Sequence, residues 1–272
     1  MPRGRSVVPC EFSEDEFQAL AFAALNEKYR AVVVGGPYLE DRRAERRHGV
    51  DAWIAIRAAG AVRVLCFQYK VPKLVINPGL DPECAALFAD RPHFRFALHK
   101  DRELQKAGAT DVHLQHNNLV RLRSKVGLPA VYCAPTYIWR DDLTRAFFRK
   151  EIYEKALLGD PADIGYVAGT DSHHVSYSET GGAWGFHSEA RELPPPAALD
   201  EMLAEAPAIE GSAQSLRRLA EVIEGDLALA APDEVTGGDE NEAAVEAILR
   251  LGRLMRLAAR SALVLVPDRW RA

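Results

Sequence analysis

Apolar residues recur every three or four positions between residues 13 and 29, and this spacing predicts an amphipathic helix. Ser13 followed by Glu16 matches a capping box, in which the two side chains satisfy backbone N–H groups at a helix start. The stripe that would face the core consists of Phe17, Leu20, Ala21, Ala24, Leu25 and Tyr29.

Two strand-like runs follow this helix, at Val50–Arg57 and Val62–Tyr69. The segment between them, Ala58–Ala61, contains a glycine and suits a hairpin turn. The second run is apolar on both faces in its middle, which is typical of an inner strand of a sheet. A shorter β-branched run at Ala31–Val34 precedes the hairpin.

Further helices and strands are expected downstream. His93–Leu98 alternates aromatic and polar residues as a strand does, and Asp111–Val126 has helical spacing. Ala130–Ala134 predicts a short buried strand that Pro135 ends, and Asp141–Leu158 predicts a second long helix. The order helix, strand, strand, helix, strand indicates the α/β class.

The C-terminal half differs in character. Gly, Ser, Thr, His and aromatic residues dominate from residue 159, which predicts short strands and loops up to the proline-rich stretch at 191–197. Helical spacing then returns at about 198–205, 212–226 and 239–261. We expect an α/β core over residues 1–158 and an extension over 159–272, with a loop and strand segment at 159–197 and a mostly helical part at 198–272.

Composition is that of an ordinary globular chain, with 272 residues, 48% hydrophobic content and a net charge of −5. No apolar run approaches the roughly 18 residues of a membrane-spanning helix, and the start lacks the apolar segment of a secretory signal. The four cysteines are widely spaced, which favours reduced thiols. A cytoplasmic protein with no membrane association is expected.

Polar residues stand at the open end of the predicted hairpin. Asp51 opens the first strand, and Gln68 and Lys70 close the second. Folding the pair about Gly60 brings Asp51 opposite residue 69, next to Gln68 and Lys70. Gln68 and Lys70 share a face because side chains alternate along a strand.

This group suits a hydrated divalent cation, because Mg²⁺ prefers oxygen ligands and needs only one or two carboxylates. Asp51 is the first expected ligand. The Gln68 amide and the Tyr69 main-chain carbonyl offer further oxygens, and Glu45 offers a second carboxylate. Bound Mg²⁺ or Mn²⁺ activates water and neutralises a phosphate, while Lys70 would stabilise the charge that develops. The predicted chemistry is phosphodiester hydrolysis.

An aspartate followed after about 16 residues by Q-x-K resembles the PD-(D/E)XK nuclease superfamily, which has the restriction-endonuclease-like fold. More narrowly, a family of uncharacterised bacterial proteins is similar over about residues 13–135, through the motifs E-x₃-G-x-D-A, F-Q-x-K, F-R-F, L-Q-H and V-Y-C-A-P. The resemblance implies a mixed sheet flanked by helices and an endonuclease, with DNA as the favoured substrate and antiviral defence as a setting.

The resemblance also assigns roles to residues. Asp51 and Gln68 would bind the metal, Lys70 would be the catalytic lysine, and Glu45 would be the acid upstream of the strand, with Glu27 as an alternative to it. Two departures are present. Val50 stands where the superfamily commonly has proline, and the uncharged Gln68 replaces an acid. A catalytically inactive nuclease-fold protein that binds or regulates is therefore the alternative function.

Candidate substrate contacts lie on both sides of the motif. Arg46 and Arg47 precede Asp51, and a helix N-terminus near Gln115 and His116 favours an anion such as phosphate. A buried, hydrogen-bonded core histidine is the alternative for His116. The overall acidic charge opposes nucleic-acid binding.

A third possibility is a zinc-dependent hydrolase that uses His173, His174 and His187. For partners, the sequence leaves open a homodimer or a partner protein of a defence system.

Overall fold

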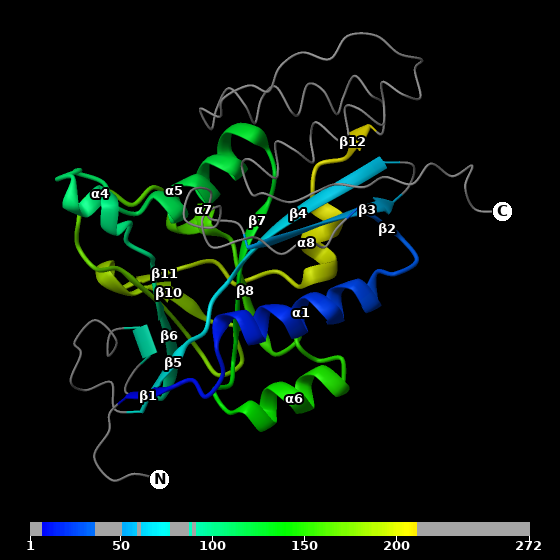
Figure 1. The fold of residues 1–272 in the computed structure, drawn as a ribbon, viewed down its shortest axis with the longest axis horizontal. Coiled ribbons are helices and arrows are strands. Elements are labelled where there is room, and N and C mark those ends of the chain that lie inside the picture. The colour runs from blue at the N-terminus through cyan, green and yellow to red at the C-terminus, as the bar shows by residue number, and fades with distance from the viewer. Residues whose placement is uncertain (1–6, 36–50, 59–60, 77–86, 89–90, 211–272) are drawn as a thin grey trace.

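The computed structural model of the chain describes residues 7–35, 51–58, 61–76, 87–88 and 91–210. The predictions for Glu45, Arg46 and Arg47, and for helices at 212–226 and 239–261, lie outside these residues. The described residues form a mixed α/β fold that contains two sheets (Figure 1).

The first sheet contains the predicted hairpin, and its strand order is β2–β3–β4–β7–β8. These strands span Val33–Gly35, Ala52–Ala58, Ala61–Tyr69, Ala130–Pro135 and Ala156–Gly159. Strands β2, β3 and β4 are antiparallel neighbours, whereas β7 runs parallel to β4. A short strand β12 (Ile209–Glu210) pairs with the start of β4. Strand β4 is therefore an inner strand, as its apolar residues predict.

The second sheet is antiparallel throughout, in the order β1–β5–β6–β9–β10–β11. Its strands span Val7–Pro9, Lys73–Val75, His93–Ala97, His174–Tyr177, Trp184–Phe186 and Arg191–Glu192. The domain boundary predicted at residue 158 falls within β8. Strands from both sides of that boundary pair in this sheet, where β6 meets β9.

Helices cover the sheets. They span Glu14–Lys28 (α1), Arg102–Lys106 (α4), Leu114–Arg121 (α5), Arg140–Phe148 (α6), Pro161–Ile164 (α7) and Leu199–Glu205 (α8). A π-helical turn extends α5 over Leu122–Val126, and a 3-10 turn follows β10 at His187–Glu189. Within the described residues, no helix has the length and apolar character needed to cross a bilayer.

Helix α1 begins where its sequence predicts. The Ser13 side chain accepts a hydrogen bond from the Glu16 N–H at 3.1 Å, as an N-cap does. The Glu16 carboxylate pairs with Arg140 at the start of α6. The buried residues Phe17, Ala21 and Leu25 form the predicted apolar stripe.

The helix predicted over Asp141–Leu158 is wrong beyond Phe148. Lys150 adopts a positive φ of 61°, which a right-handed helix cannot continue through. The apolar residues that follow are buried for another reason, because Leu157 and Leu158 belong to strand β8. Helical spacing across the turn between α6 and β8 was therefore coincidental.

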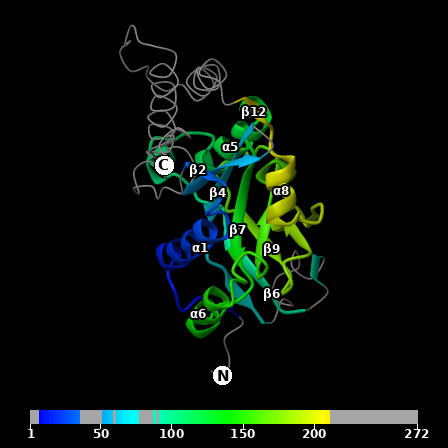
Figure 2. The ribbon, with the colours of Figure 1, turned by 90° about the vertical axis from the view of Figure 1, so that its right-hand side faces the viewer.

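The core has two layers on opposite faces of the first sheet. One lies between the two sheets and includes Cys66, Phe96, Tyr132, Tyr177 and Trp184. The other lies under α1, α6 and α8 and includes Phe17, Leu65, Phe67, Leu143 and Leu203. In Figure 1, α1, α6 and α8 lie to the right of β8 and the second sheet lies to its left. Figure 2 likewise shows α1 and α6 on one side of β7 and β6 and β9 on the other.

The turn just after α6 is joined to α1 by an exposed ion pair. Lys150 Nζ lies 2.6 Å from Glu27 Oε1, and both side chains are more than half exposed. Such exposed pairs contribute little to stability.

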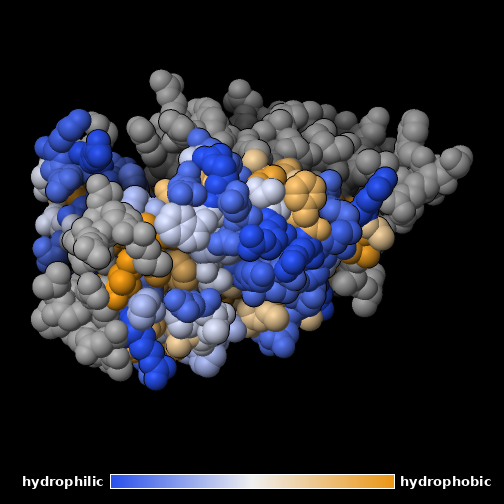
Figure 3. All heavy atoms as spheres, turned by 90° about the horizontal axis from the view of Figure 1, so that it is seen from below, coloured by the Kyte–Doolittle hydropathy of each residue, from blue (hydrophilic) through white to orange (hydrophobic). Residues whose placement is uncertain are grey.

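From below, the described surface is mostly hydrophilic, with apolar residues in small separate groups (Figure 3).

Candidate active site

Asp51 lies at the open end of the hairpin, as predicted, and its side chain is held firmly. The neighbouring register pairs Ala52 with Phe67, so Asp51 sits across from Gln68. Asp51 Oδ2 accepts hydrogen bonds from Gln68 Nε2 and from the Tyr69 N–H, both at 2.6 Å. The Asp51 main-chain carbonyl accepts a third bond, from Gln18 Nε2 of α1 at 3.1 Å. Only 3% of Asp51 is exposed.

Gln68 is fully buried and only partly hydrogen-bonded. Its Nε2 donates to Asp51 and lies 3.4 Å from the Tyr69 carbonyl. Its Oε1 has no hydrogen-bond partner within the described residues, and the side chain is 0% exposed. A buried carbonyl without a partner lowers the stability of the fold by about 1–3 kcal/mol. A hydrogen-bond donor or a cation at this oxygen would remove that penalty.

Lys70 follows β4 and reaches the first turn of α1. Its Nζ lies 3.4 Å from Glu14 Oε1, and the side chains are 9% and 31% exposed respectively. Glu14 was not predicted from the sequence as a residue of this site. An acid in the first turn of a helix is common because it complements the helix dipole, so nothing in the sequence singled it out.

Tyr132 extends the row of polar groups onto a third strand. Parallel pairing of β4 with β7 sets Tyr132 beside Gln68, and both side chains lie on the face between the sheets. The Tyr132 hydroxyl lies 2.7 Å from His116 Nδ1, and His116 Nε2 lies 2.7 Å from the Gly165 carbonyl. Burial, with a smaller effect of the Asp51 charge, raises the pKa of the Tyr132 hydroxyl.

The directions of these hydrogen bonds follow from chemistry. The Gly165 carbonyl can only accept, so His116 Nε2 carries the proton. Burial lowers the pKa of His116 to about 4, so at neutral pH its Nδ1 is a bare acceptor and the Tyr132 hydroxyl donates to it. The Tyr132 oxygen therefore keeps its lone pairs for other groups. In the backbone register, the polar residues Asp51, Gln68 and Tyr132 stand side by side, just before β3, on β4 and on β7.

The other predicted residues take varied positions. Glu45, Arg46 and Arg47 lie outside the described residues. His116 is 1% exposed with both ring nitrogens bonded, which is the buried-core alternative, and Gln115 beside it is 5% exposed. Glu27 pairs with Lys150 on the surface at the far end of α1 from Glu14, so it does not join Asp51.

A zinc site built on the histidines is not found in the described residues, which contain no cluster of three or more His, Cys, Asp or Glu able to hold a metal ion. His173 packs its ring against His113 and Phe186, with centroids 4.9 and 5.3 Å away. His174 starts β9, and the His187 side chain lies outside the description.

Comparison with known proteins finds no match among family models, curated proteins or solved structures.

Proposed function

We propose that the chain is a metal-dependent nuclease that hydrolyses phosphodiester bonds, with DNA as the favoured substrate and Mg²⁺ or Mn²⁺ as the cofactor. The observation that carries the proposal is the buried Gln68 carbonyl oxygen, which has no hydrogen-bond partner among the described residues, on a side chain whose Nε2 donates to the Asp51 carboxylate. A hard cation is bound by oxygen ligands of this kind.

The residues present fit such a cation. Asp51 and Gln68 would hold it. The Tyr69 carbonyl lies 3.4 Å from Gln68 Nε2, and Tyr132 is the register partner of Gln68 on the neighbouring strand β7. Mg²⁺ keeps several waters, so one carboxylate and one amide oxygen are a sufficient protein contribution. When bound, the ion would activate water and neutralise phosphate charge.

Lys70 and Glu14 supply the rest of the chemistry. The Lys70 ammonium would stabilise negative charge that develops on the phosphate in the transition state. Glu14 pairs with that ammonium and brings a second carboxylate to the end of β4, 3.4 Å from Lys70 Nζ. Gln18, one turn further along α1, fixes the Asp51 backbone.

The arrangement of elements supports the same proposal. Helix α1, the antiparallel strands β2, β3 and β4, helix α5 and the parallel strand β7 occur in this order along the chain, with β5, β6 and α4 between β4 and α5. The resemblance to the restriction-endonuclease-like fold implies a mixed sheet flanked by helices. Here α1, α6 and α8 cover one face of the mixed sheet, and the second sheet packs on the other. The polar row lies where β3 begins and where β4 and β7 run side by side.

Cleavage assays test the proposal. Purified full-length protein is incubated with supercoiled DNA, linear DNA and RNA in Mg²⁺ or Mn²⁺, alongside Asp51→Asn and Lys70→Met. We expect metal-dependent cleavage that each substitution reduces at least about a hundredfold. Glu27→Gln is the matched control on the same helix as Glu14 and should cleave normally. Equal cleavage by wild type and Asp51→Asn contradicts the proposal.

A second candidate is a nuclease-fold protein that binds nucleic acid or a protein partner without cutting. The burial of Asp51, Gln68 and Lys70, which are 3%, 0% and 7% exposed, favours it because a substrate must reach these groups. The neutral Gln68 also lowers the charge available to a metal. Saturable binding of nucleic acid by a protein that never cleaves it would support this candidate.

A further inference from the structure

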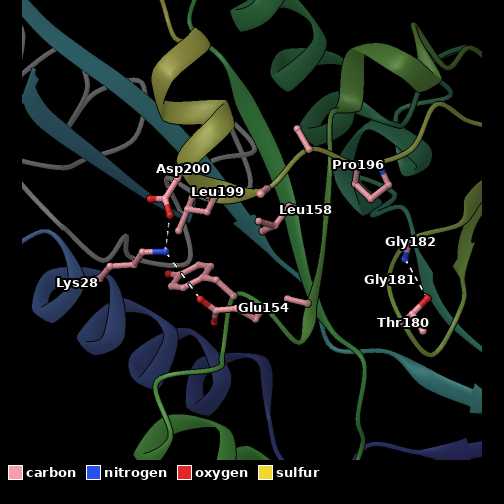
Figure 4. Close-up of a pocket in the computed structure, with 13 residues that line it drawn as sticks. Lys28, Glu154, Leu158, Thr180, Gly181, Gly182, Pro196, Leu199 and Asp200 are labelled. Carbon is pink, nitrogen blue, oxygen red and sulfur yellow. Dashed lines mark hydrogen bonds and ion pairs between the residues drawn. The ribbon is translucent and has the colours of Figure 1, made fainter.

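A second site lies at the other end of α1. A pocket of about 350 Å³ opens between the last turn of α1, the start of β8, the β9–β10 turn and the start of α8 (Figure 4). Its volume is at the lower end of the ~300–1,000 Å³ range of small-molecule pockets. Because α1 has 15 residues, the pocket and the Glu14 end are roughly 20 Å apart. The pocket is therefore independent of the proposed nuclease site.

Charge on one wall of the pocket is negative. Lys28 Nζ lies 3.0 Å from Asp200 Oδ2 and 3.8 Å from Glu154 Oε1, so one ammonium faces two carboxylates. Asp200 also accepts a hydrogen bond from the Tyr29 hydroxyl, and this bond, with Lys28, lowers its pKa. Glu154 is the less closely paired of the two acids, because its contact with Lys28 is the longer one. Figure 4 shows Lys28 between the two acids.

A second wall of the pocket is apolar, and Thr180, Gly181 and Gly182 of the β9–β10 turn form a third. Ala156 and Leu158 of β8, Pro196 of the linker and Leu199 of α8 line the pocket together with Tyr153. Leu158 and Leu199 belong to the packed core under the helices, so these walls are part of the fixed structure. A ligand that fits would carry an apolar body and a polar head at the Glu154 end.

We propose that this pocket binds a small organic cation, an amine or guanidine carried on a compact apolar body. The cationic head pairs with Glu154, whose charge is the less well compensated of the two acids. The body covers the apolar walls between β8 and α8. Lys28 competes with the ligand for Glu154, and it keeps Asp200 neutralised.

Because the charged wall carries two carboxylates and one ammonium, removing a carboxylate and removing the ammonium should change the affinity for a cation in opposite directions. Glu154→Gln removes the partner of the cation and should weaken binding at least about fivefold. Lys28→Met removes the competing ammonium and should strengthen binding. Glu179→Gln, which removes a carboxylate from the exposed β9–β10 turn just outside the pocket lining, is the matched control and should leave binding unchanged.

Gly182 provides an independent test of location. It lines the pocket and has no positive φ, and a Cβ added there would meet only Thr180 Oγ1, at an ordinary 3.5 Å. A larger residue is therefore tolerated by the backbone. Gly182→Phe should reduce ligand binding by obstructing the pocket while leaving the melting temperature close to that of wild type.

Tyramine is the probe, and its binding to the full-length protein is measured by titration calorimetry. Two molecules with the same ring serve as references: 4-ethylphenol, which lacks the charge, and 4-hydroxyphenylacetate, which is an anion. We expect tyramine to bind with a Kd below about 1 mM and more tightly than either reference, with the opposite effects of Glu154→Gln and Lys28→Met stated above.

Three results overturn the proposal: no saturable tyramine binding, binding of the anion at least as tight as that of the amine, or unchanged tyramine binding by Glu154→Gln. Cleavage activity plays no part in the readout, so the outcome is independent of the nuclease proposal.

Discussion

Lys70 Nζ and Glu14 Oε1 lie 3.4 Å apart, which joins the end of the central strand β4 to the first turn of α1. The contact brings a carboxylate from a separate element to the motif that the hairpin supplies. It also predicts how the site responds when the pair is broken.

Glu14→Gln should lower the free energy of unfolding by about 1–3 kcal/mol, because it removes a charged partner from an ammonium whose side chain is only 9% exposed. Chemical denaturation measures the change. The control is Glu27→Gln, which breaks the exposed pair with Lys150 and should cost less than about 0.5 kcal/mol. A double-mutant cycle with Lys70→Met should show coupling, and additive effects would contradict a specific pair.

Much of this site could be predicted from local pattern. Two alternating apolar runs around a short turn predict the hairpin and bring Asp51 to the end of the second strand. The structure sets Asp51 across from Gln68, one residue from the partner predicted at position 69. Ser13 marks the start of α1 in the same way. Local rules of hydrogen bonding and alternation determine these features.

Glu14 and Tyr132 could not be predicted, because each joins the site through tertiary packing. Glu14 resembles any first-turn acid until α1 is laid against the end of β4. Tyr132 lies in an apolar run, and only the β4–β7 register sets it beside Gln68. The missed strand β8 has a similar cause, since burial of Leu157 and Leu158 mimicked a helical stripe.

Tyr132→Phe should destabilise the fold by about 1–3 kcal/mol, because it leaves His116 Nδ1 buried without a donor. Tyr137 offers a matched control. Its hydroxyl is buried with no hydrogen-bond partner in the described part of the chain, so Tyr137→Phe should be neutral or stabilising. Thermal or chemical unfolding of the two variants compares them. Equal losses would show that the Tyr132–His116 bond does not stabilise the fold.

Stability should fall as pH falls through the range set by His116. Burial lowers its folded pKa from 6.5 to about 4, so below pH 6.5 the unfolded chain binds the proton more readily than the folded one. The stability present above pH 6.5 is then lost progressively down to about pH 4, by about 3 kcal/mol. The free energy of unfolding measured across this pH range should change less for His116→Gln than for wild type. Parallel curves would contradict the neutral, buried state of His116.

Gln68→Glu distinguishes the effect of residue 68 on the stability of the metal-free protein from its effect on metal binding. A carboxylate in place of the amide, which now lies 2.6 Å from Asp51 Oδ2, should lower stability in chelator because two buried negative charges repel. Added Mn²⁺ should then raise the melting temperature of this variant more than that of wild type. A variant that Mn²⁺ does not rescue would argue against a cation between these side chains.

The central claim is that Asp51 and Gln68 hold a divalent cation, and a Mn²⁺ titration followed by electron paramagnetic resonance tests it most directly. We predict saturable binding by wild type that persists in Glu27→Gln and disappears in Asp51→Asn, with the Asp51→Asn protein shown to be folded by its circular dichroism. Mn²⁺ binding that is absent from wild type, or equally strong in Asp51→Asn, would contradict the account.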